Sequence, residues 1–160
     1  MLRRGVDIAK KFGASLPSFP DLATATRYFS DRRKARLSSL FDLAARSGFL
    51  SLDFSPDSLK RIELWYFDLH ARCGFEDLGT ERNTFEEYIA TYFGEVVVRN
   101  VTGTSWVVKE FAFTKGKYQC SVQQGLGTMM LDVFRDLYKW PDNKKRESIY
   151  RMYKKYFREK

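Results

Sequence analysis

The residue in this sequence best suited to acid–base chemistry is its single histidine, His70. It falls in a predicted helix over residues 56–73, seven positions after Glu63, so the two side chains share one helix face. A glutamate that orients a histidine is a familiar catalytic unit. The alternative is that both side chains flank the apolar stripe of the helix as solvated residues. No motif ties a serine or cysteine nucleophile to them, so we expect a protein that is not an enzyme.

Metal and cofactor sites are not predicted either. One histidine and the two separated cysteines, Cys73 and Cys120, cannot form a closed zinc site. We interpret both cysteines as buried, small apolar side chains. No calcium-loop spacing occurs in the chain, and a carboxylate site would need chance convergence of distant acidic residues.

Glycines at positions 125 and 127 follow a predicted strand and lead into a predicted helix, which is the context of a dinucleotide-binding loop. Met130 stands where such a loop has its third glycine, and its side chain would obstruct the approach of a phosphate. No flanking βαβ units are predicted. We therefore interpret this segment as a tight turn followed by a helix that Thr128 caps.

Basic residues gather in two segments. Residues 144–160 contain eight Lys or Arg and two Glu, and Arg151, Lys155 and Arg158 share one face of the predicted helix there. These three are candidate phosphate-binding residues, because basic helices that also carry aromatic side chains can bind nucleic acid. The alternatives are an acidic protein partner or a solvated face. The second cluster comprises Arg27, Arg32, Arg33, Lys34 and Arg36.

The helix predicted over residues 56–73 is apolar on two sides. Leu64 and Phe67 lie away from the main stripe, and Trp65 lies at its edge. A helix of this kind is either sandwiched within the fold or exposes a patch to a partner. Trp65, Leu64 and Phe67 are therefore candidate partner-binding residues. Alternatively, the N-terminal segment covers them.

The elements that would position these residues follow from periodicity and capping signals. In the first half we expect a weakly structured stretch over residues 1–20, a helix over 22–47 capped by Asp21 with a break near 30–31, a strand over 49–54, and the helix over 56–73 with Ser55 as its cap. In the second half we expect a helix over 85–100 with a capping box of Thr84 and Glu87, a hairpin over about 105–123, a helix after Thr128, and a last helix over 144–157.

Two positions in the helix over residues 85–100 carry further expectations. Gly94 follows Ala90 by one turn, which predicts close packing against the sheet or a neighbouring helix. The alternative is a ligand that lies against the helix at this position. Glu95 and Arg99 have the spacing of a helical ion pair on the surface. The predicted fold class is α+β: a small antiparallel sheet with a β-hairpin, packed by five or so helices.

The length of 160 residues fits one domain, with residues 1–20 loosely attached to it. Neither a signal peptide nor a run of roughly 20 apolar residues appears, so we expect a cytoplasmic protein without a membrane span. The formal net charge of +8 favours nucleic acid, an acidic membrane surface or an acidic protein partner. The two-sided helix over residues 56–73 adds an apolar protein partner. The 16% share of aromatic residues suits both cores and interfaces. The sequence does not indicate the oligomeric state.

Two segments resemble a family of small, uncharacterised bacterial proteins. The first is the Ser-Leu helix start within residues 53–63, and the second is the Tyr-x-Gly-Glu-Val motif within residues 92–97, followed by Gly103 and Trp106. The resemblance implies an α+β fold in a bacterial protein. It implies no activity and no site residues.

These observations predict a non-enzymatic protein-interaction domain, either a regulatory adaptor or a toxin-neutralising protein. The support is the aromatic content, the two-sided helix and the lack of a reaction centre. The alternative is sequence-independent binding of nucleic acid through the basic C-terminal helix. An acid–base enzyme that uses Glu63 and His70 is the least favoured hypothesis.

Overall fold

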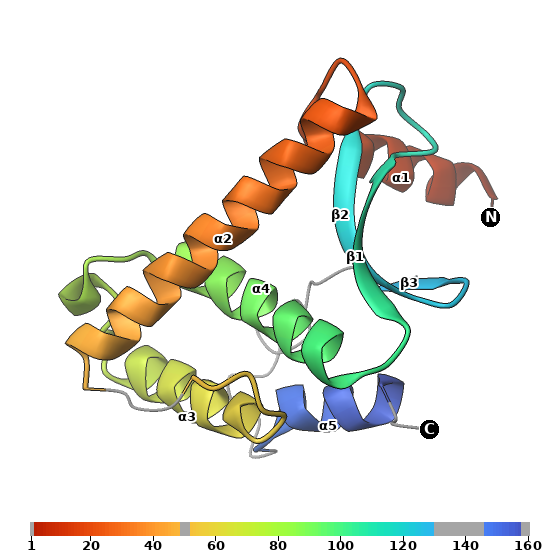
Figure 1. Ribbon diagram of the computed structural model, residues 1–160. Helices are drawn as coiled ribbons and strands as arrows, with labels where there is room; N and C mark the ends of the chain where they lie inside the picture. Colours follow the sequence, from red (N-terminus) through yellow and green to blue (C-terminus); the bar gives the residue numbers. More distant parts are fainter. Residues whose placement is uncertain (1, 49–51, 130–145, 158–160) are drawn as a thin grey trace.

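The computed structural model describes residues 2–48, 52–129 and 146–157, and it confirms an α+β fold (Figure 1). From the N-terminus, the elements are α1 (Leu2–Ser15), α2 (Leu22–Arg46), α3 (Ser58–Ala71), a short 3-10 helix (Glu76–Leu78), α4 (Arg82–Asn100), β1 (Thr104–Glu110), β2 (Tyr118–Gln124), β3 (Gly127–Met129) and α5 (Ser148–Tyr156). Figure 1 shows α4 in the middle of the molecule, with α2 crossing it and α3 and α5 below it.

The sheet is antiparallel, with strand order β1-β2-β3. Its first two strands form the predicted hairpin, in a register that pairs Thr104 with Gln124 and Glu110 with Tyr118. Gly116 in the connecting loop has a φ of 75°, a conformation that glycine adopts without steric cost. The prediction that Thr128 caps a helix is wrong, because Thr128 pairs with Gln123 in β3. The rest of that predicted helix lies outside the described residues.

The long helix α2 begins where the sequence predicts. The Asp21 carboxylate accepts a hydrogen bond from the Thr24 N–H at 2.7 Å, which satisfies one of the unpaired donors of the first turn. The predicted break near residues 30–31 is wrong, since α2 runs without interruption to Arg46. Gly48, with a φ of 68°, follows the helix end.

The central helix α4 starts earlier than predicted. The Phe85 N–H donates to the Glu81 carbonyl, so the first turn forms at Arg82, and Thr84 lies inside the helix instead of capping it. Gly94 is buried, as its predicted packing role requires. Because α4 is surrounded by other elements, it buries side chains on several faces: Phe85, Ile89, Tyr92, Phe93, Val96 and Val97.

One hydrophobic core joins α2, α3, α4, β2 and α5. Its largest buried side chains include Tyr66, Phe85, Tyr92, Phe93 and Tyr153. The Tyr92 hydroxyl lies 2.6 Å from the Ser58 hydroxyl and accepts the Phe54 N–H at 2.9 Å. These buried polar atoms of Tyr92, Ser58 and Phe54 therefore satisfy one another.

The strand predicted over residues 49–54 is wrong for its described part, residues 52–54, which form no strand. Phe54 has a φ of 58°, which a β-strand does not allow. Residues 49–51 lie outside the described residues. The helix predicted from Pro56 starts at Ser58, although the Ser55 hydroxyl still accepts the Ser58 N–H at 3.2 Å.

Both cysteines differ from their predicted burial. Cys73 follows the end of α3 with a φ of 52° and is exposed. The helix ends at Ala71, before Cys73 can join its buried face. Cys120 lies on β2 as predicted and is half-buried.

The N-terminal stretch is not weakly structured as predicted, because residues 2–15 form α1. The chain after α1 runs beside the hairpin: the Tyr118 N–H donates to the Pro17 carbonyl at 3.2 Å, and the Phe19 N–H donates to the Gly116 carbonyl at 3.0 Å. Among the described helices, none has the length and apolar character that a membrane crossing needs.

Candidate functional site

Glu63 lies in the middle of α3, yet its carboxylate caps another helix. One oxygen accepts the Ser148 N–H at 3.0 Å, and the other accepts the Ile149 N–H at 2.8 Å. The first N–H groups of a helix have no partners within it, and a negative charge there is favourable to the helix dipole. Glu63, which is 1% exposed, therefore holds the start of α5 against α3.

The predicted pairing of Glu63 with His70 is not found. His70 is exposed in the last turn of α3, and its ring lies 6.1 Å from that of Tyr66. Both oxygens of Glu63 are occupied by α5, so this carboxylate neither orients the imidazole nor faces a substrate. The geometry supports a structural role for Glu63 and does not support the acid–base hypothesis.

The capping contact brings together two surfaces that lie far apart in the sequence. From α3, Lys60, Leu64 and Phe67 have the spacing of one helix face. Tyr150 of α5 lies at the Lys60 end of this row, and Arg146, just before α5, lies at the Phe67 end. Lys154, in the last turn of α5, lies over the same Tyr150 ring. We call these residues the α3–α5 surface: Lys60, Leu64, Phe67, Arg146, Tyr150 and Lys154.

Cations cover the aromatic rings of the α3–α5 surface. The Lys60 ammonium lies 4.1 Å from the centre of the Tyr150 ring, and the Lys154 ammonium lies 5.8 Å from it. The Arg146 guanidinium lies 5.2 Å from the centre of the Phe67 ring. Such contacts hold positive charge against apolar surface. An ion pair with Asp57 at 2.9 Å raises the pKa of Lys60, which keeps this side chain protonated.

The three candidate partner-binding residues differ in exposure. Leu64 is 57% exposed and Phe67 is half-buried. The assignment of Trp65 to a binding surface is wrong, because its side chain is 6% exposed and packs edge-on against Phe85 at 5.0 Å. A shift of one residue along a helix turns the side chain by about 100°, enough to move Trp65 from the surface into the core.

The candidate phosphate-binding residues are only partly described. Arg151 and Lys155 are exposed on α5, and the Arg151 guanidinium donates to the Arg146 carbonyl. Arg158 lies outside the described residues. Lys60 could have been predicted from its spacing to Leu64 and Phe67. Arg146 and Tyr150 could not, because only tertiary packing brings them to α3.

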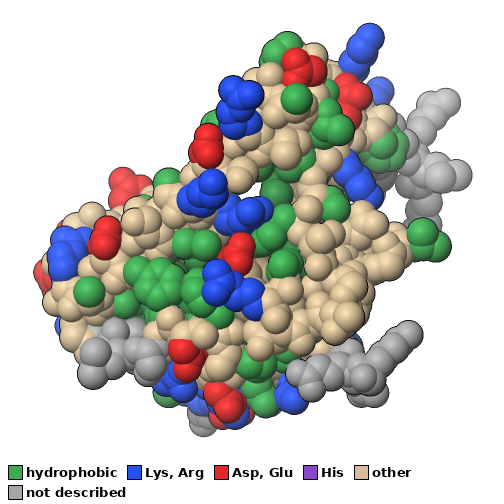
Figure 2. Space-filling model, viewed as in Figure 1, with side chains coloured by type: hydrophobic (Ala, Val, Ile, Leu, Met, Phe, Trp, Pro, Cys, Tyr) green, Lys and Arg blue, Asp and Glu red, His purple; other side chains and the backbone are tan. Residues whose placement is uncertain are grey.

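A second charged cluster lies where α2, α4 and β1 meet. The predicted ion pair of Glu95 with Arg99 is confirmed at 3.2 Å, but Glu95 is not a simple surface residue. Its side chain, 12% exposed, also pairs with Arg33 at 3.2 Å and accepts the Trp106 indole N–H at 2.9 Å. Figure 2 shows Lys and Arg side chains beside an acidic one over α2 and α4. Within the described ranges, no group of three His, Cys, Asp or Glu side chains could hold a metal ion.

Comparison with known proteins places the chain in a family. Residues 18–157 match the family described as "Uncharacterised protein YwmA". The chain belongs to this family. A relative from Bacillus subtilis (strain 168), also described as uncharacterized protein YwmA, is 27% identical over 109 residues, which cover 68% of this chain and 69% of that protein.

The family match confirms the predicted resemblance to small, uncharacterised bacterial proteins. Both segments on which the resemblance rests, within residues 53–63 and 92–106, lie inside the matched range. No solved structure matches the chain. The family description names no activity, so a function for this member of the YwmA family has to be argued from its own surface.

Proposed function

We propose that this chain is a non-enzymatic protein-interaction domain that binds an acidic partner through the α3–α5 surface. The observation that carries the proposal is the exposed Leu64, 57% accessible, on the helix face between Lys60 and Phe67, whose neighbours include the Arg146 guanidinium over the Phe67 ring. An exposed apolar side chain near basic side chains is complementary to a partner surface that has an apolar residue near Asp or Glu side chains. A regulatory adaptor and a toxin-neutralising protein could both use such a surface.

The aromatic rings of the surface favour protein over nucleic acid. Proteins that bind single strands without sequence preference stack bases on open aromatic faces. Here cations already lie over the Tyr150 and Phe67 rings. A base that stacks on the covered face of either ring would have to displace a lysine or an arginine, whereas a carboxylate could pair with Arg146 or Lys154 where they lie.

A site-specific crosslinker can test the proposal and identify the partner in the same experiment. A photo-reactive phenylalanine analogue at Leu64 should crosslink to one acidic protein in the native cell. The same analogue at Asp42, exposed on α2, is the matched control position. Once the partner is identified, Lys60→Glu with Lys154→Glu should weaken its binding at least tenfold, and Lys34→Glu on α2 should leave binding unchanged.

Two results would contradict the proposal. The first is a crosslinking pattern at Leu64 that equals the pattern at Asp42. The second is a titration with single-stranded DNA at low salt in which binding weakens as salt rises and is lost in the Lys60→Glu, Lys154→Glu variant. That result would assign the surface to phosphate binding.

A further inference from the structure

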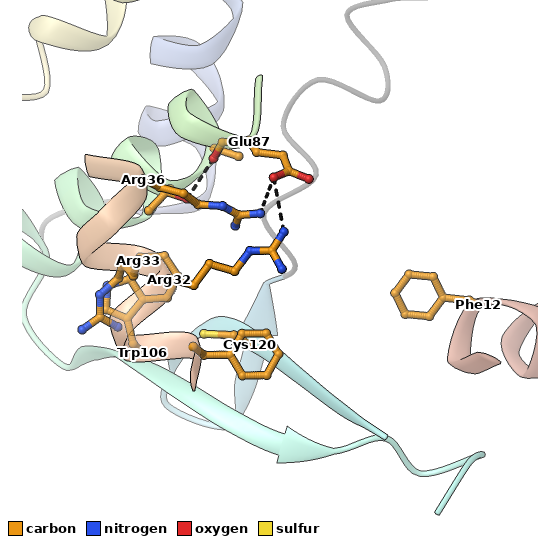
Figure 3. A pocket seen from close by; sticks show the side chains of 10 residues that line it. Phe12, Arg32, Arg33, Arg36, Glu87, Trp106 and Cys120 are labelled. Atoms are coloured by element: carbon orange, nitrogen blue, oxygen red, sulfur yellow. Dashed lines mark hydrogen bonds and ion pairs between the residues drawn. The ribbon is translucent and has the colours of Figure 1, made fainter. Parts of the chain in front are cut away.

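A pocket of about 300 Å³ lies between α1, α2, α4 and the sheet, apart from the α3–α5 surface. Its apolar walls include Phe12 of α1, Phe29 of α2, Trp106 of β1 and Cys120 of β2. Figure 3 shows Arg32 and Arg36 reaching from α2 toward Glu87 of α4, with Trp106 and Cys120 on the strand side and Phe12 opposite them. The volume is at the lower end for ligand sites, which run from about 300 to 1,000 Å³.

The charges at this pocket are unbalanced. Arg32 and Arg36, one turn apart on α2, both pair with one carboxylate oxygen of Glu87, at 3.5 Å and 2.5 Å. Beside them, Arg33 and Arg99 share the carboxylate of Glu95, at 3.2 Å each. Four guanidinium groups against two carboxylates leave two positive charges in excess within this cluster.

The arrangement at Glu87 has an electrostatic cost, because like charges one turn apart on a helix repel each other. The Arg32 guanidinium is held by the Tyr28 hydroxyl, to which it donates at 2.5 Å, as well as by Glu87 at 3.5 Å. An additional anion between Arg32 and Arg36 would relieve this repulsion. Guanidinium groups also match the planar or tetrahedral oxygens of carboxylates and phosphates with two parallel hydrogen bonds.

The wall next to the arginines is held in place. The Arg33 guanidinium lies 5.0 Å from the centre of the Trp106 ring, and the Trp106 indole N–H is fixed by Glu95 at 2.9 Å. Burial raises the pKa of the Cys120 thiol, so this side chain is neutral and adds to the apolar wall. A rigid flat ring beside an apolar thiol favours a flat, apolar ligand body.

We infer that this pocket binds a small organic anion, namely a carboxylate or phosphate group attached to an aromatic ring. The anionic oxygens pair with Arg32 and Arg36, and the ring lies among Phe29, Trp106 and Cys120. The inference does not depend on the proposed protein interaction, because the two sites share no residue.

Calorimetric titration with defined probes tests the inference. Phenyl phosphate and benzoate should bind, whereas benzamide, which has the ring without the charge, should not. Comparison of the two acids shows which anionic group the site prefers. Arg32→Gln with Arg36→Gln should weaken binding at least tenfold, and Lys34→Gln, an exposed residue of the same helix, should leave it unchanged.

A variant that should strengthen binding, instead of weakening it, separates loss of ligand binding from loss of the fold. Glu87→Gln removes the carboxylate that competes for both arginines, so it should tighten the binding of the anionic probe several-fold. The bound probe should also slow the alkylation of Cys120 but not that of the exposed Cys73. Both measurements remain informative if the double arginine variant fails to fold.

Several outcomes would overturn the inference. One is that neither acid binds, or that benzamide binds as tightly as the acids. Another is that the Glu87→Gln variant binds the anionic probe no more tightly than the parent protein does. A third is that inorganic phosphate binds as tightly as phenyl phosphate and leaves the alkylation rate of Cys120 unchanged. Binding of a peptide that ends in a phenylalanine carboxylate, but of neither free acid, would assign the pocket to a protein chain end instead of a small molecule.

Discussion

At the scale of single residues, Glu63 shows how a charge becomes part of a core. Its carboxylate is buried, and both oxygens accept N–H groups from the start of α5. A buried hydrogen bond to a charged group is strong, and loss of one partner leaves the other unsatisfied. Glu63 therefore stabilises the contact between two helices that are distant in sequence.

Replacement of Glu63 should measure this contact. Glu63→Ala leaves the buried Ile149 N–H and the half-buried Ser148 N–H without acceptors, so we expect the free energy of unfolding to fall by about 1–3 kcal/mol for the buried group and by less for the other. Urea denaturation followed by circular dichroism gives the value. Glu76→Gln, at an exposed position in the 3-10 helix, is the control and should change little. Equal stability of Glu63→Ala and the parent protein would show that the cap contributes nothing.

The two cysteines should react at different rates. Burial raises the pKa of Cys120, so little of this side chain is thiolate at neutral or mildly alkaline pH, and it is also less accessible than the exposed Cys73. Because the thiolate is the nucleophile, iodoacetamide at pH 8 should modify Cys73 first. Mass spectrometry of the digested protein gives both rates. Unfolding in urea should make the two rates similar, and faster modification of Cys120 in the folded protein would contradict the expectation.

Residue-level predictions succeed where both partners belong to one helical segment. The Asp21 cap and the Glu95–Arg99 pair are confirmed because each needs only local spacing. The partners of Glu63, in contrast, are 85 and 86 positions away in sequence, so no periodic pattern could reveal them. The same limit applies to the tertiary contacts of Arg33 and Trp106 with Glu95.

At the scale of elements, the Asp21 cap makes a prediction with a defined pH dependence. Hydrogen bonds from Thr24 lower the pKa of Asp21 below its ordinary value of 3.8. A lowered pKa means that the charged form is favoured in the folded state. Its stabilisation is fully present above pH 3.8 and is lost as the pH falls through the lowered pKa.

Asp21→Ala should therefore lower the Tm at pH 7, and the difference from the parent protein should shrink as the pH is reduced below about 3.8. Asp21→Asn keeps an oxygen acceptor at the cap, so its Tm should stay closer to that of the parent at pH 7. Thermal melts between pH 3 and pH 7 test both points. A constant difference at every pH would show that Asp21 acts by something other than its charge.

Four helices and the hairpin were predictable from periodicity, whereas α1 was missed and two other segments were assigned the wrong type of element. The alternation of apolar and polar residues over 49–54 favoured a strand. In the structure, the Phe54 N–H donates to the Tyr92 hydroxyl, and Phe54 has a positive φ. Thr128 has the sequence signature of a helix cap, yet it pairs with Gln123 in the sheet. In both places a contact from another element overrides the local preference.

At the scale of the whole molecule, α4 is the element on which the others pack. It contributes to the core on several faces, and it also supplies Glu87 and Glu95 to the charged cluster with α2. The α3–α5 surface and the arginine-lined pocket lie on different elements. The α3–α5 surface depends on α4 indirectly, because α3 packs against α4 in the core. The pocket depends on α4 directly, because Glu87 of this helix lines it.

This shared core predicts that the chain unfolds as one unit. Ile149 of α5 is 0% exposed and belongs to the same cluster as the buried residues of α3 and α4. Ile149→Ala should lower the free energy of unfolding by about 2–5 kcal/mol. If α5 is a part of one cooperative domain, the amides of α4 and α5 should lose the same amount of protection in native-state hydrogen exchange.

Arg151→Ala is a suitable control for that experiment, because Arg151 is exposed on the same helix and its replacement should change stability by no more than about 0.5 kcal/mol. Loss of protection confined to α5 would show that this helix opens alone and is a separate cooperative unit. The Glu63 cap would then stabilise only the docking of α5. The α3–α5 surface would in that case exist only while α5 is docked, and partner binding would shift the helix toward its docked state.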